Sequence, residues 1–418
     1  MTTEAILDPG AEEAIPPVPR ISLQAFCETA GLAETIAIAA EDRRMDRAHV
    51  RVHMGGAPAA VESYRSAPTP NVVVLEAATK RDDILNNLDQ LAEVCDATTR
   101  VIVVGRVNDI VLYRELMARG VSDYLIQPID VIDVVRSVSR LYSADGAKPV
   151  GRLLAVIGAK GGCGASTVAH NIAWAVSRQV EIDTCLVDMD IAFGTAGLDF
   201  NQDPPQGIAD AVASPDRVDQ AFIDRLLARC SEHLSLLAAP ATLDRTCDYN
   251  ADTFDPVFDN LRNSVPTIVV DIPHVWTAWT KRVLTTADDI LVVCAPDLAN
   301  LRNAKNMIDL LRTLRPNDRP ARYCLNMVGM PKRPEIKPAD FAKALEAEPA
   351  TILPFDPQLF GTAANNGQMI DEIEPGHKIA QQFGELALAM TGRAEIRKPK
   401  NGLSARLIER LSMLRKKA

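Results

Sequence analysis

Residues 153–167 read LLAVIGAKGGCGAST, and this stretch decides the fold of the larger part of the chain. The apolar run Leu153–Ile157 predicts a buried strand, and residues 166–178 predict a helix. Between them lies Ala159–Thr167, a loop that holds three glycines. Glycines let main-chain N–H groups turn inward toward phosphate oxygens, and the start of a helix adds its positive end. A strand, a glycine-rich loop and a helix in this order predict a phosphate-binding loop.

The loop departs from the usual pattern at one position. Phosphate-binding loops end in Gly-Lys-Ser/Thr, whereas Ala165 holds the lysine position here and Lys160 stands at the front of the loop. The hydroxyl of Ser166 stands where it would ligate Mg²⁺. A plain glycine turn with a solvated Lys160 is the alternative interpretation. The residues predicted to bind nucleotide here are Lys160, Gly161, Gly162, Cys163, Gly164, Ala165, Ser166 and Thr167.

Three features further along the chain favour the nucleotide site. One predicted strand ends in Asp188, with Asp190 on the loop beyond it. Another ends in Asp271, which suits a water-mediated contact to Mg²⁺, and a third ends in Asn326. The carboxyl ends of parallel strands meet at one edge of a sheet, where open α/β sheets bind ligands. A glycine turn with strand-ending aspartates would need all of these features to coincide by chance.

Strands and helices alternate in two successive blocks. In the first block the clearest strands are 71–75, 100–104 and 123–126, with helices at 82–95 and 110–119. In the second the strands are 153–157, 184–188, 234–237, 267–271, 289–294 and 322–326, with helices at 166–178, 301–314 and 378–391. Continuous apolar strands that alternate with helices predict two α/β domains, each with a doubly wound parallel sheet. The predicted boundaries are a disordered leader 1–19, a first domain 20–143, a linker 144–151, a second domain 152–392 and a tail 393–418.

Composition narrows the class of protein. The 418-residue chain has a formal net charge of −10, which argues against nucleic acid as its partner. No apolar run approaches the ~20 residues needed to span a bilayer, and the first residues, MTTEAILDPGAEEAIPPVPR, lack the features of a secretory signal. The eight cysteines form no C-x-x-C pair and the histidines are dispersed, so no zinc site is predicted. We therefore expect a cytoplasmic protein with reduced thiols.

The tail differs from the rest of the chain. Residues 393–418 hold nine Lys and Arg against two Glu, and leucines at 403, 407, 411 and 414 fall on one helical stripe. Such a segment could lie on an anionic membrane surface, dock on a partner, or be a solvated terminal helix.

The motifs K-G-G-x-G-x-S-T, V-D-x-D and V-V-D-x-P together resemble the MinD/ParA superfamily of deviant Walker-type ATPases. The resemblance implies ATP and Mg²⁺ as cofactors and a homodimer in which Lys160 reaches the phosphates held by the partner copy. It implies that Asp190 positions the attacking water, so Lys160 and Asp190 are the candidate catalytic residues. It places Ser166, Asp188 and Asp271 at the metal.

The same resemblance implies a base-binding side of the site. Asn326 matches the residue that reads adenine, and Pro354 with Asp356 matches the loop beside the base. An iron–sulfur reductase of the same superfamily is not favoured, because no suitably placed cysteine pair could bridge two subunits.

Two departures narrow the family: Ala165 and the N-terminal domain. With the phrases LAAP (237–240), DIPHVW (271–276) and PDLANLRNAK (296–305), they resemble CpaE/TadZ. That family implies Flp/tad pilus assembly, pilus-assembly partners and a polar position peripheral to the inner membrane. The missing lysine removes a charge that would offset developing phosphate charge, so ATP binding with slow hydrolysis is expected. A DNA-segregating ParA-type ATPase and a nucleotide-dead scaffold are the alternatives.

The N-terminal domain resembles a two-component receiver whose phosphorylation site has degenerated. Glu76 stands in place of the phosphorylated aspartate, Gly105 in place of a hydroxyl residue, and Gln127 in place of a lysine. The resemblance implies an unphosphorylated module for dimerisation or docking.

Two tryptophans follow the strand that ends in Asp271. Trp276 and Trp279, in HVWTAWT, could pack in the core or form a nucleotide-sensitive surface for a partner.

Overall fold

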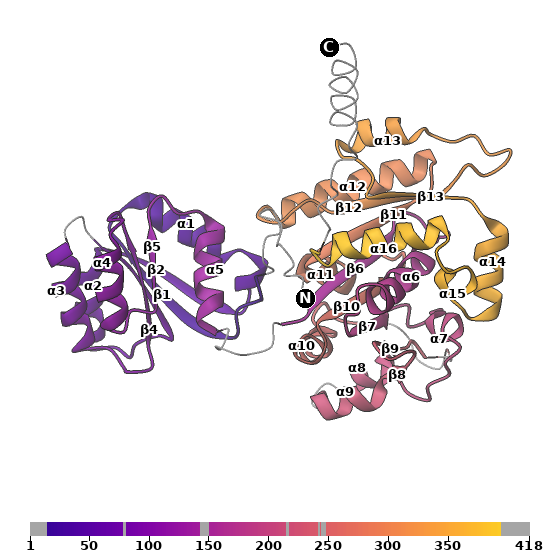
Figure 1. The fold of residues 1–418 in the computed structure, drawn as a ribbon. Coiled ribbons are helices and arrows are strands. Elements are labelled where there is room, and N and C mark those ends of the chain that lie inside the picture. The colour runs from indigo at the N-terminus through magenta and orange to yellow at the C-terminus, as the bar shows by residue number, and fades with distance from the viewer. Residues whose placement is uncertain are drawn as a thin grey trace, which may run out of the picture.

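The computed structural model describes residues 15–77, 81–142, 150–214, 217–240, 243 and 248–393. Two α/β units follow one another along the chain (Figure 1). Residues 1–14 and 394–418 lie outside the described residues, so the expectations for most of the leader and of the basic tail fall outside them as well.

The smaller unit contains a five-stranded parallel sheet in the order β2-β1-β3-β4-β5. Its strands are β1 (Ile21–Cys27), β2 (Ala48–Met54), β3 (Val72–Glu76), β4 (Arg100–Gly105) and β5 (Asp123–Ile126). One face packs against α1 (Ala30–Ala40) and α5 (Val131–Tyr142). The other packs against α2 (Gly56–Tyr64), α3 (Arg81–Ala92) and α4 (Ile110–Ala118). Helices on both faces of a parallel sheet make this unit doubly wound, as predicted.

The larger unit contains an eight-stranded sheet in the order β13-β12-β11-β6-β10-β7-β9-β8, parallel except that β8 runs antiparallel to β9. Its strands are β6 (Arg152–Gly158), β7 (Thr184–Asp188), β8 (Ala228–Arg229), β9 (Leu234–Leu237), β10 (Thr267–Ile272), β11 (Asp289–Cys294), β12 (Arg322–Val328) and β13 (Thr351–Pro354). Its helices are α6 (Ala165–Arg178), α7 (Ala196–Asp199), α8 (Ile208–Ala213), α9 (Gln220–Leu226), α10 (Asp255–Ser264), α11 (Ala278–Thr286), α12 (Leu298–Leu314), α13 (Pro338–Leu345), α14 (Pro357–Asn366), α15 (Ile370–Ile373) and α16 (Lys378–Met390).

The core of the larger unit lies on both faces of its sheet. All residues of β10 are buried, and β6 is buried from Leu153 onward, because helices cover both sides. One apolar cluster joins the sheet to α6 and α16, and a second joins it to α10, α11 and α12. Each buried Leu, Ile or Val in these clusters contributes about 1.5–3 kcal/mol by leaving water. This packing fixes β6, and hence the loop that follows it.

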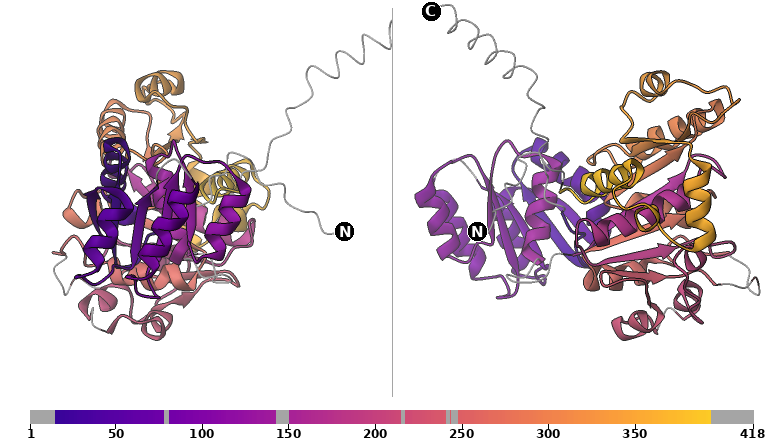
Figure 2. Two further views of the ribbon diagram at one scale, coloured as in Figure 1. Left: turned by 90° about the vertical axis from the view of Figure 1, so that its left-hand side faces the viewer. Right: turned by 45° about the vertical axis from the view of Figure 1, so that its right-hand side comes forward.

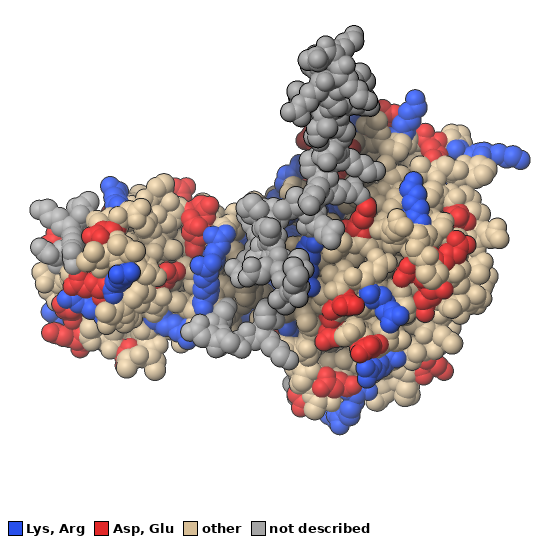
Figure 3. Space-filling model, viewed as in Figure 1, with Lys and Arg blue, Asp and Glu red and all other residues tan. Residues whose placement is uncertain are grey.

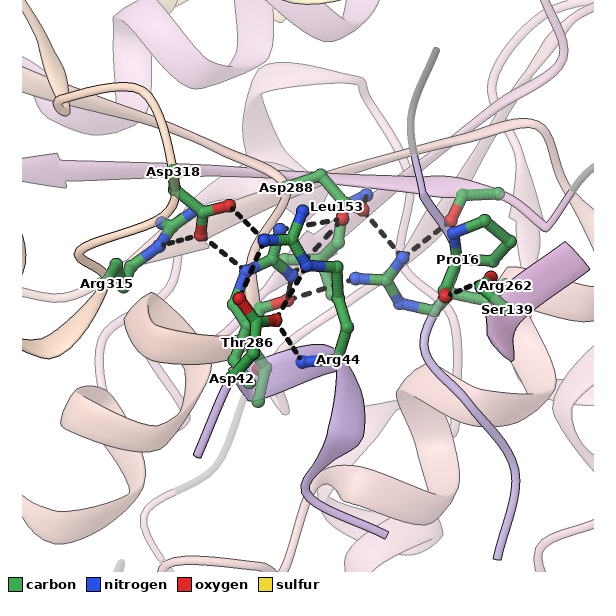
Figure 4. Close-up of polar contacts among 12 residues, drawn as sticks. Pro16, Asp42, Arg44, Ser139, Leu153, Arg262, Thr286, Asp288, Arg315 and Asp318 are labelled. Atoms are coloured by element: carbon green, nitrogen blue, oxygen red, sulfur yellow. Dashed lines mark hydrogen bonds and ion pairs between the residues drawn. The ribbon is translucent and has the colours of Figure 1, made fainter. Parts of the chain in front are cut away.

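The two units lie side by side (Figures 1 and 2). A short 3₁₀ helix of the smaller unit, η1 (Arg43–Met45), contacts the larger unit at the amino end of its sheet, just before β11. The Arg43 guanidinium contacts Asp318 at 2.6 Å and Asp288 at 3.4 Å. Asp288 also accepts the main-chain N–H of Leu153, at the start of the strand that leads to the glycine-rich loop (Figure 4). The smaller unit therefore docks at the amino ends of the strands, whereas the glycine-rich loop lies at their carboxyl ends.

The predicted leader is ordered at its end. Val18 is 1% exposed and its N–H donates to the carbonyl of Arg44, while Ser139 donates to the carbonyl of Pro16. The prediction of disorder up to residue 19 is therefore wrong for residues 15–19. Proline-rich composition does not reveal that one apolar side chain fills a gap in a neighbouring core.

Acidic and basic side chains are interspersed over the face of the larger unit seen in Figure 3. The seven described cysteines are free thiols. Among the described helices, none is both long enough and apolar enough to cross a membrane.

Candidate nucleotide-binding site

The glycine-rich loop has the backbone that phosphate binding requires. It leaves β6 at Gly158 and enters α6 at Ala165. Gly162 and Gly164 have φ values of 79° and 80°, a left-handed conformation that side chains disfavour. No side chain caps the first turn of α6, so the positive end of the helix faces the loop.

The loop is braced from neighbouring strands and helices. The N–H of Ala159 donates to the carbonyl of Val293 on β11, and Asn303 on α12 donates to the carbonyl of Ala159. The buried thiol of Cys163 lies 3.2 Å from the carbonyl of Val293. Burial raises the pKa of this thiol, so it acts as a small core residue. Lys160, Gly161 and Gly162 are exposed, and residues 164–167 are half-buried.

The two predicted metal-site carboxylates lie side by side. Asp188 ends β7 and Asp271 lies near the end of β10, and the two residues are register partners in the sheet. Both are buried, at 1% and 3% exposure. Burial first, and then the charge of Asp271, hold the pKa of Asp188 well above its usual range. Two buried carboxylates at this spacing favour a cation between them and a ligand.

The loop after β7 folds back on Asp188. The main-chain N–H groups of Asp190 and Ala196 donate to its two carboxylate oxygens, at 3.0 and 3.1 Å. Gly194 is pressed against the same carboxylate, because a Cβ there would lie 2.3 Å from Oδ2. Asp190 itself is half-buried, and its Oδ1 accepts the N–H of Phe193. This loop is called the switch segment, residues 190–199.

A histidine that the sequence analysis missed lies between these parts. His170, on α6, is fully buried, with Nδ1 2.7 Å from Asp199 and Nε2 3.4 Å from Asp271. The first contact is a hydrogen bond, whereas the second is close enough for an ion pair but lacks hydrogen-bond geometry. Burial lowers the pKa of His170, but the two aspartates outweigh it and raise the pKa to about 10. The helical spacing from Ser166, one turn earlier, is the signal that could have pointed to it.

The residues predicted to lie beside the base, Asn326, Pro354 and Asp356, differ in how far they are buried. Asn326 is buried, its amide donates to the carbonyl of Cys163 at 2.9 Å, and its oxygen accepts the N–H of Met327. In this arrangement Asn326 supports the glycine-rich loop, and its role as an adenine reader stays a prediction. Pro354, at the end of β13, is exposed, and Asp356 caps α14 by accepting the N–H of Leu359.

The residues present fit a nucleotide with Mg²⁺. Oδ1 of Asp271 is buried and has no hydrogen-bond partner among the described residues. An unpaired buried carboxylate oxygen is costly unless a cation or water meets it. Mg²⁺ is commonly held by one or two carboxylates, a hydroxyl and phosphate oxygens, and Asp188, Asp271 and Ser166 provide that donor set.

Large apolar side chains surround this edge of the sheet. Phe193 and Leu198 of the switch segment are 73% and 74% exposed, Trp276 is 50% exposed, and Leu298 at the start of α12 is 72% exposed. Trp279, three residues after Trp276, is buried and packs on Phe254 with ring centroids 5.3 Å apart. The alternatives for the two tryptophans are thus divided: Trp279 is a core residue and Trp276 a surface residue.

The three residues of the predicted degenerate receiver site converge in the smaller unit. The buried carboxylate of Glu76 accepts the N–H groups of Glu28 and Thr29, the Thr29 hydroxyl and the Gln127 amide, all at 2.7–2.8 Å. Burial raises the pKa of Glu76, but these four donors outweigh it and hold the pKa below its usual value. The position of Gly105 has no room for a side chain, because a Cβ would lie 2.4 Å from the Tyr124 hydroxyl.

The chain is similar to MinD proteins in sequence and in fold. No protein-family model matches the chain. The curated MinD septum site-determining protein of Synechocystis is 27% identical over 161 residues, which are 38% of this chain and 59% of that protein. The chain spans little more than half the length of the first curated relatives that it matches. A Pyrococcus horikoshii MinD solved with Mg-ADP has a TM-score of 0.51 at 18% identity, covering 57% of this chain and 95% of that one, which supports the fold.

A sequence match to a second solved structure decides the family. The pilus assembly protein CpaE from Caulobacter crescentus is 50% identical, covers 31% of this chain and 98% of that one, and has a TM-score of 0.30. Because half of the aligned residues are identical over nearly the whole of that chain, this protein belongs to the CpaE-type members of the MinD/ParA superfamily.

Proposed function

We propose that this protein binds ATP with Mg²⁺ at the carboxyl edge of the eight-stranded sheet and acts as a nucleotide-controlled assembly factor. One observation carries the proposal: the left-handed Gly162 and Gly164 and the uncapped start of α6 face the same edge as the paired Asp188 and Asp271. Main-chain amides and a helix end favour phosphate, and the carboxylates favour the metal.

We infer that two copies associate through this edge. Phe193, Leu198, Trp276 and Leu298 expose apolar area around the site, and Lys160 is exposed at its front. Exposed large apolar side chains grouped around a site are typical of an interface. Lys160 would then meet the phosphates in the partner copy, where a charge is most useful once water is excluded.

Hydrolysis is proposed to be slow because the loop lacks its resident lysine. Ala165 offers no charge to offset the charge that develops on the transferred phosphate. The main-chain donors, the metal site and Lys160 remain for binding. Asp190, on the switch segment, is the proposed residue for orienting water.

The biological setting is proposed from the family. The Caulobacter relative is a pilus assembly protein, and we infer that this chain also serves a pilus-assembly machine and has pilus-assembly proteins as partners. A polar position at the inner membrane belongs to the same proposal. The formal net charge of −10 favours this over a DNA-segregating role, since nonspecific DNA binding relies on grouped Lys and Arg.

The smaller unit is proposed to be a receiver-like docking module that needs no phosphorylation. Four hydrogen-bond donors already surround the carboxylate of Glu76. A phosphoryl group could be attached to this carboxylate only if these hydrogen bonds were broken. Phosphate uptake from acetyl phosphate by the full chain would contradict this proposal.

Calorimetry with Mg·ATP and sedimentation of the full-length protein test the main proposal. Wild type is expected to bind Mg·ATP and to shift from monomer toward dimer when it does. Lys160→Ala should retain binding and lose most of the dimer, whereas Lys343→Ala, on α13 away from the site, should behave as wild type. No heat of binding in wild type would leave only a structural scaffold, and normal dimerisation by Lys160→Ala would make Lys160 a solvated loop residue.

A further inference from the structure

His170 joins two parts of the candidate site that are far apart in the sequence. Its ring lies inside the larger unit with no exposed area. One nitrogen is hydrogen-bonded to Asp199 at the end of the switch segment, and the other faces Asp271 on β10. In the described part of the chain, His170 is the basic side chain that lies within ion-pair distance of Asp271. Burying a polar ring costs desolvation free energy that an apolar side chain in the same space would avoid. This cost suggests that His170 has a role beyond filling space.

The switch segment is anchored by two buried side chains. Asp188 holds both ends of the loop 190–196 through the N–H groups of Asp190 and Ala196. His170 holds its end through Asp199, and the adjacent Phe200 packs on the His170 ring with centroids 5.8 Å apart. Between the anchors the segment carries Phe193 and Leu198, the exposed apolar side chains beside the site.

The geometry points to a positioning role. We propose that His170 is the residue that links the carboxylate of Asp271 to the switch segment, so that a ligand at Asp271 sets the position of Phe193 and Leu198. This inference rests on the proposed nucleotide function for the identity of the ligand, but not for the link itself.

The physical basis is competition for one carboxylate. Asp271 has one oxygen facing His170 and one without a partner. A cation that meets the free oxygen withdraws charge from the oxygen facing His170, and this weakens the ion pair. His170 then interacts mainly with Asp199, and its ring shifts away from Asp271. Because Asp199 belongs to α7, the packing of α7 changes as well. Because the ring is rigid and enclosed, a small change at Asp271 is passed on rather than absorbed.

Two substitutions separate the two halves of the link. The amide of His170→Asn stands close to Nδ1 and preserves a donor to Asp199, but cannot reach Asp271. The amide of His170→Gln stands close to Nε2 and preserves a donor toward Asp271, but not to Asp199. Asp199 is partly exposed, and Asp199→Ala removes the same His170–Asp199 hydrogen bond that His170→Gln removes. His233→Asn is the matched control, because His233 makes the same 2.7 Å contact to Asp183 away from the site.

Hydrogen exchange of residues 190–200 without nucleotide tests the anchor. In the full-length protein, His170→Gln and Asp199→Ala should speed exchange there roughly tenfold or more, because a hydrogen bond to a charged group is lost. His170→Asn and His233→Asn should exchange as wild type. Equal acceleration in both His170 variants would mean that the ring only fills space, and no acceleration in Asp199→Ala would overturn the anchor.

Adding Mg·ATP, with binding measured separately by calorimetry, tests the transmission. Wild type should change its exchange in residues 190–200, and His170→Asn should bind Mg·ATP but lose most of this change. An unchanged response in His170→Asn would overturn the link to Asp271. If wild type gives no heat with Mg·ATP, the proposed function fails, while the exchange without nucleotide still decides whether His170 holds the segment.

Discussion

At the scale of single residues, the site differs from other phosphate-binding loops by one missing charge. Ala165 is half-buried at the first position of α6, next to Gly164, and it stands where the usual phosphate-binding loop has its lysine. The remaining cation of the loop, Lys160, is exposed at its front. We therefore expect main-chain groups to hold the phosphates, with no fixed charge over the bond that breaks.

Ala165→Lys should restore that charge. We expect steady-state ATP turnover to rise at least tenfold, because a fixed donor to developing phosphate charge is worth about 10²-fold or more in related sites. Ala165→Met is the control, since it adds similar length without charge. Equal turnover in the Lys and Met variants, or fast turnover in wild type, would show that the missing lysine does not limit the reaction.

At the scale of elements, the two tryptophans at the start of α11 lie in different places, Trp279 in the core and Trp276 on the surface. Trp279 packs against Phe254 beneath the sheet, and Trp276 lies on the loop before the helix, half exposed. Thr277 caps the helix by accepting the N–H of Thr280. Trp276 therefore precedes the cap, and Trp279 lies in the first turn of the helix. Two residues of the same type thus serve stability and the proposed interface separately.

Trp279→Ala should lower the free energy of unfolding by about 3–5 kcal/mol, the usual cost of emptying a large aromatic site. Trp276→Ala should change it by less than about 0.5 kcal/mol but weaken the Mg·ATP-dependent dimer. Urea denaturation and sedimentation measure the two effects. A destabilised Trp276→Ala, or one that dimerises as wild type does, would contradict this division.

At the scale of the whole molecule, ion pairs set the docking of the two units. Besides Arg43, the Arg44 guanidinium contacts Asp318 at 3.2 Å (Figure 4). Asn317 donates to Asp42 at 3.0 Å. Burial raises the pKa of Asp288, but Arg262 and Arg43 outweigh it and hold the pKa below its ordinary value. Burial also raises the pKa of Asp318, but Arg43 and the neighbouring arginines outweigh it and hold the pKa below its ordinary value. The candidate site lies at the opposite edge, so docking leaves the proposed dimer surface free.

Arg43→Ala should loosen this docking by ~1–3 kcal/mol, since charged hydrogen bonds are lost while Arg262 and Arg315 still neutralise the aspartates. Small-angle scattering should show a more extended molecule, and a profile identical to that of wild type would contradict the role of Arg43. Arg65→Ala, which removes an exposed pair with Glu62, is the control.

The same docking should depend on pH. Because the pKa values of Asp288 and Asp318 are lowered in the folded protein, their contribution is complete above the ordinary value of 3.8 and is lost progressively as the pH falls from there through the lowered values. Scattering profiles that already show a more extended molecule on going from pH 7 to about pH 4 would contradict this account.

The sequence by itself determined the two parallel sheets and the loop between β6 and α6. Strands Asp123–Ile126, Thr184–Asp188, Leu234–Leu237 and Asp289–Cys294 have the predicted bounds, because continuous apolar runs and local breakers suffice to define buried strands. The sequence also predicted that Asp188 and Asp271 lie at the same edge of one sheet, since parallel strands end there, whereas their direct pairing depends on β7 and β10 being neighbours.

Only the tertiary structure decided the contacts that join distant segments. His170 reads as one polar residue within a helix, and its two aspartates lie 29 and 101 positions further along the chain. The buried Val18 and the pairing of η1 with the amino edge of the sheet were likewise invisible, and β13 and the short β8 carry too few apolar residues to stand out. Local pattern records what a segment buries, whereas the identity of its neighbour depends on how the strands are ordered in the sheet.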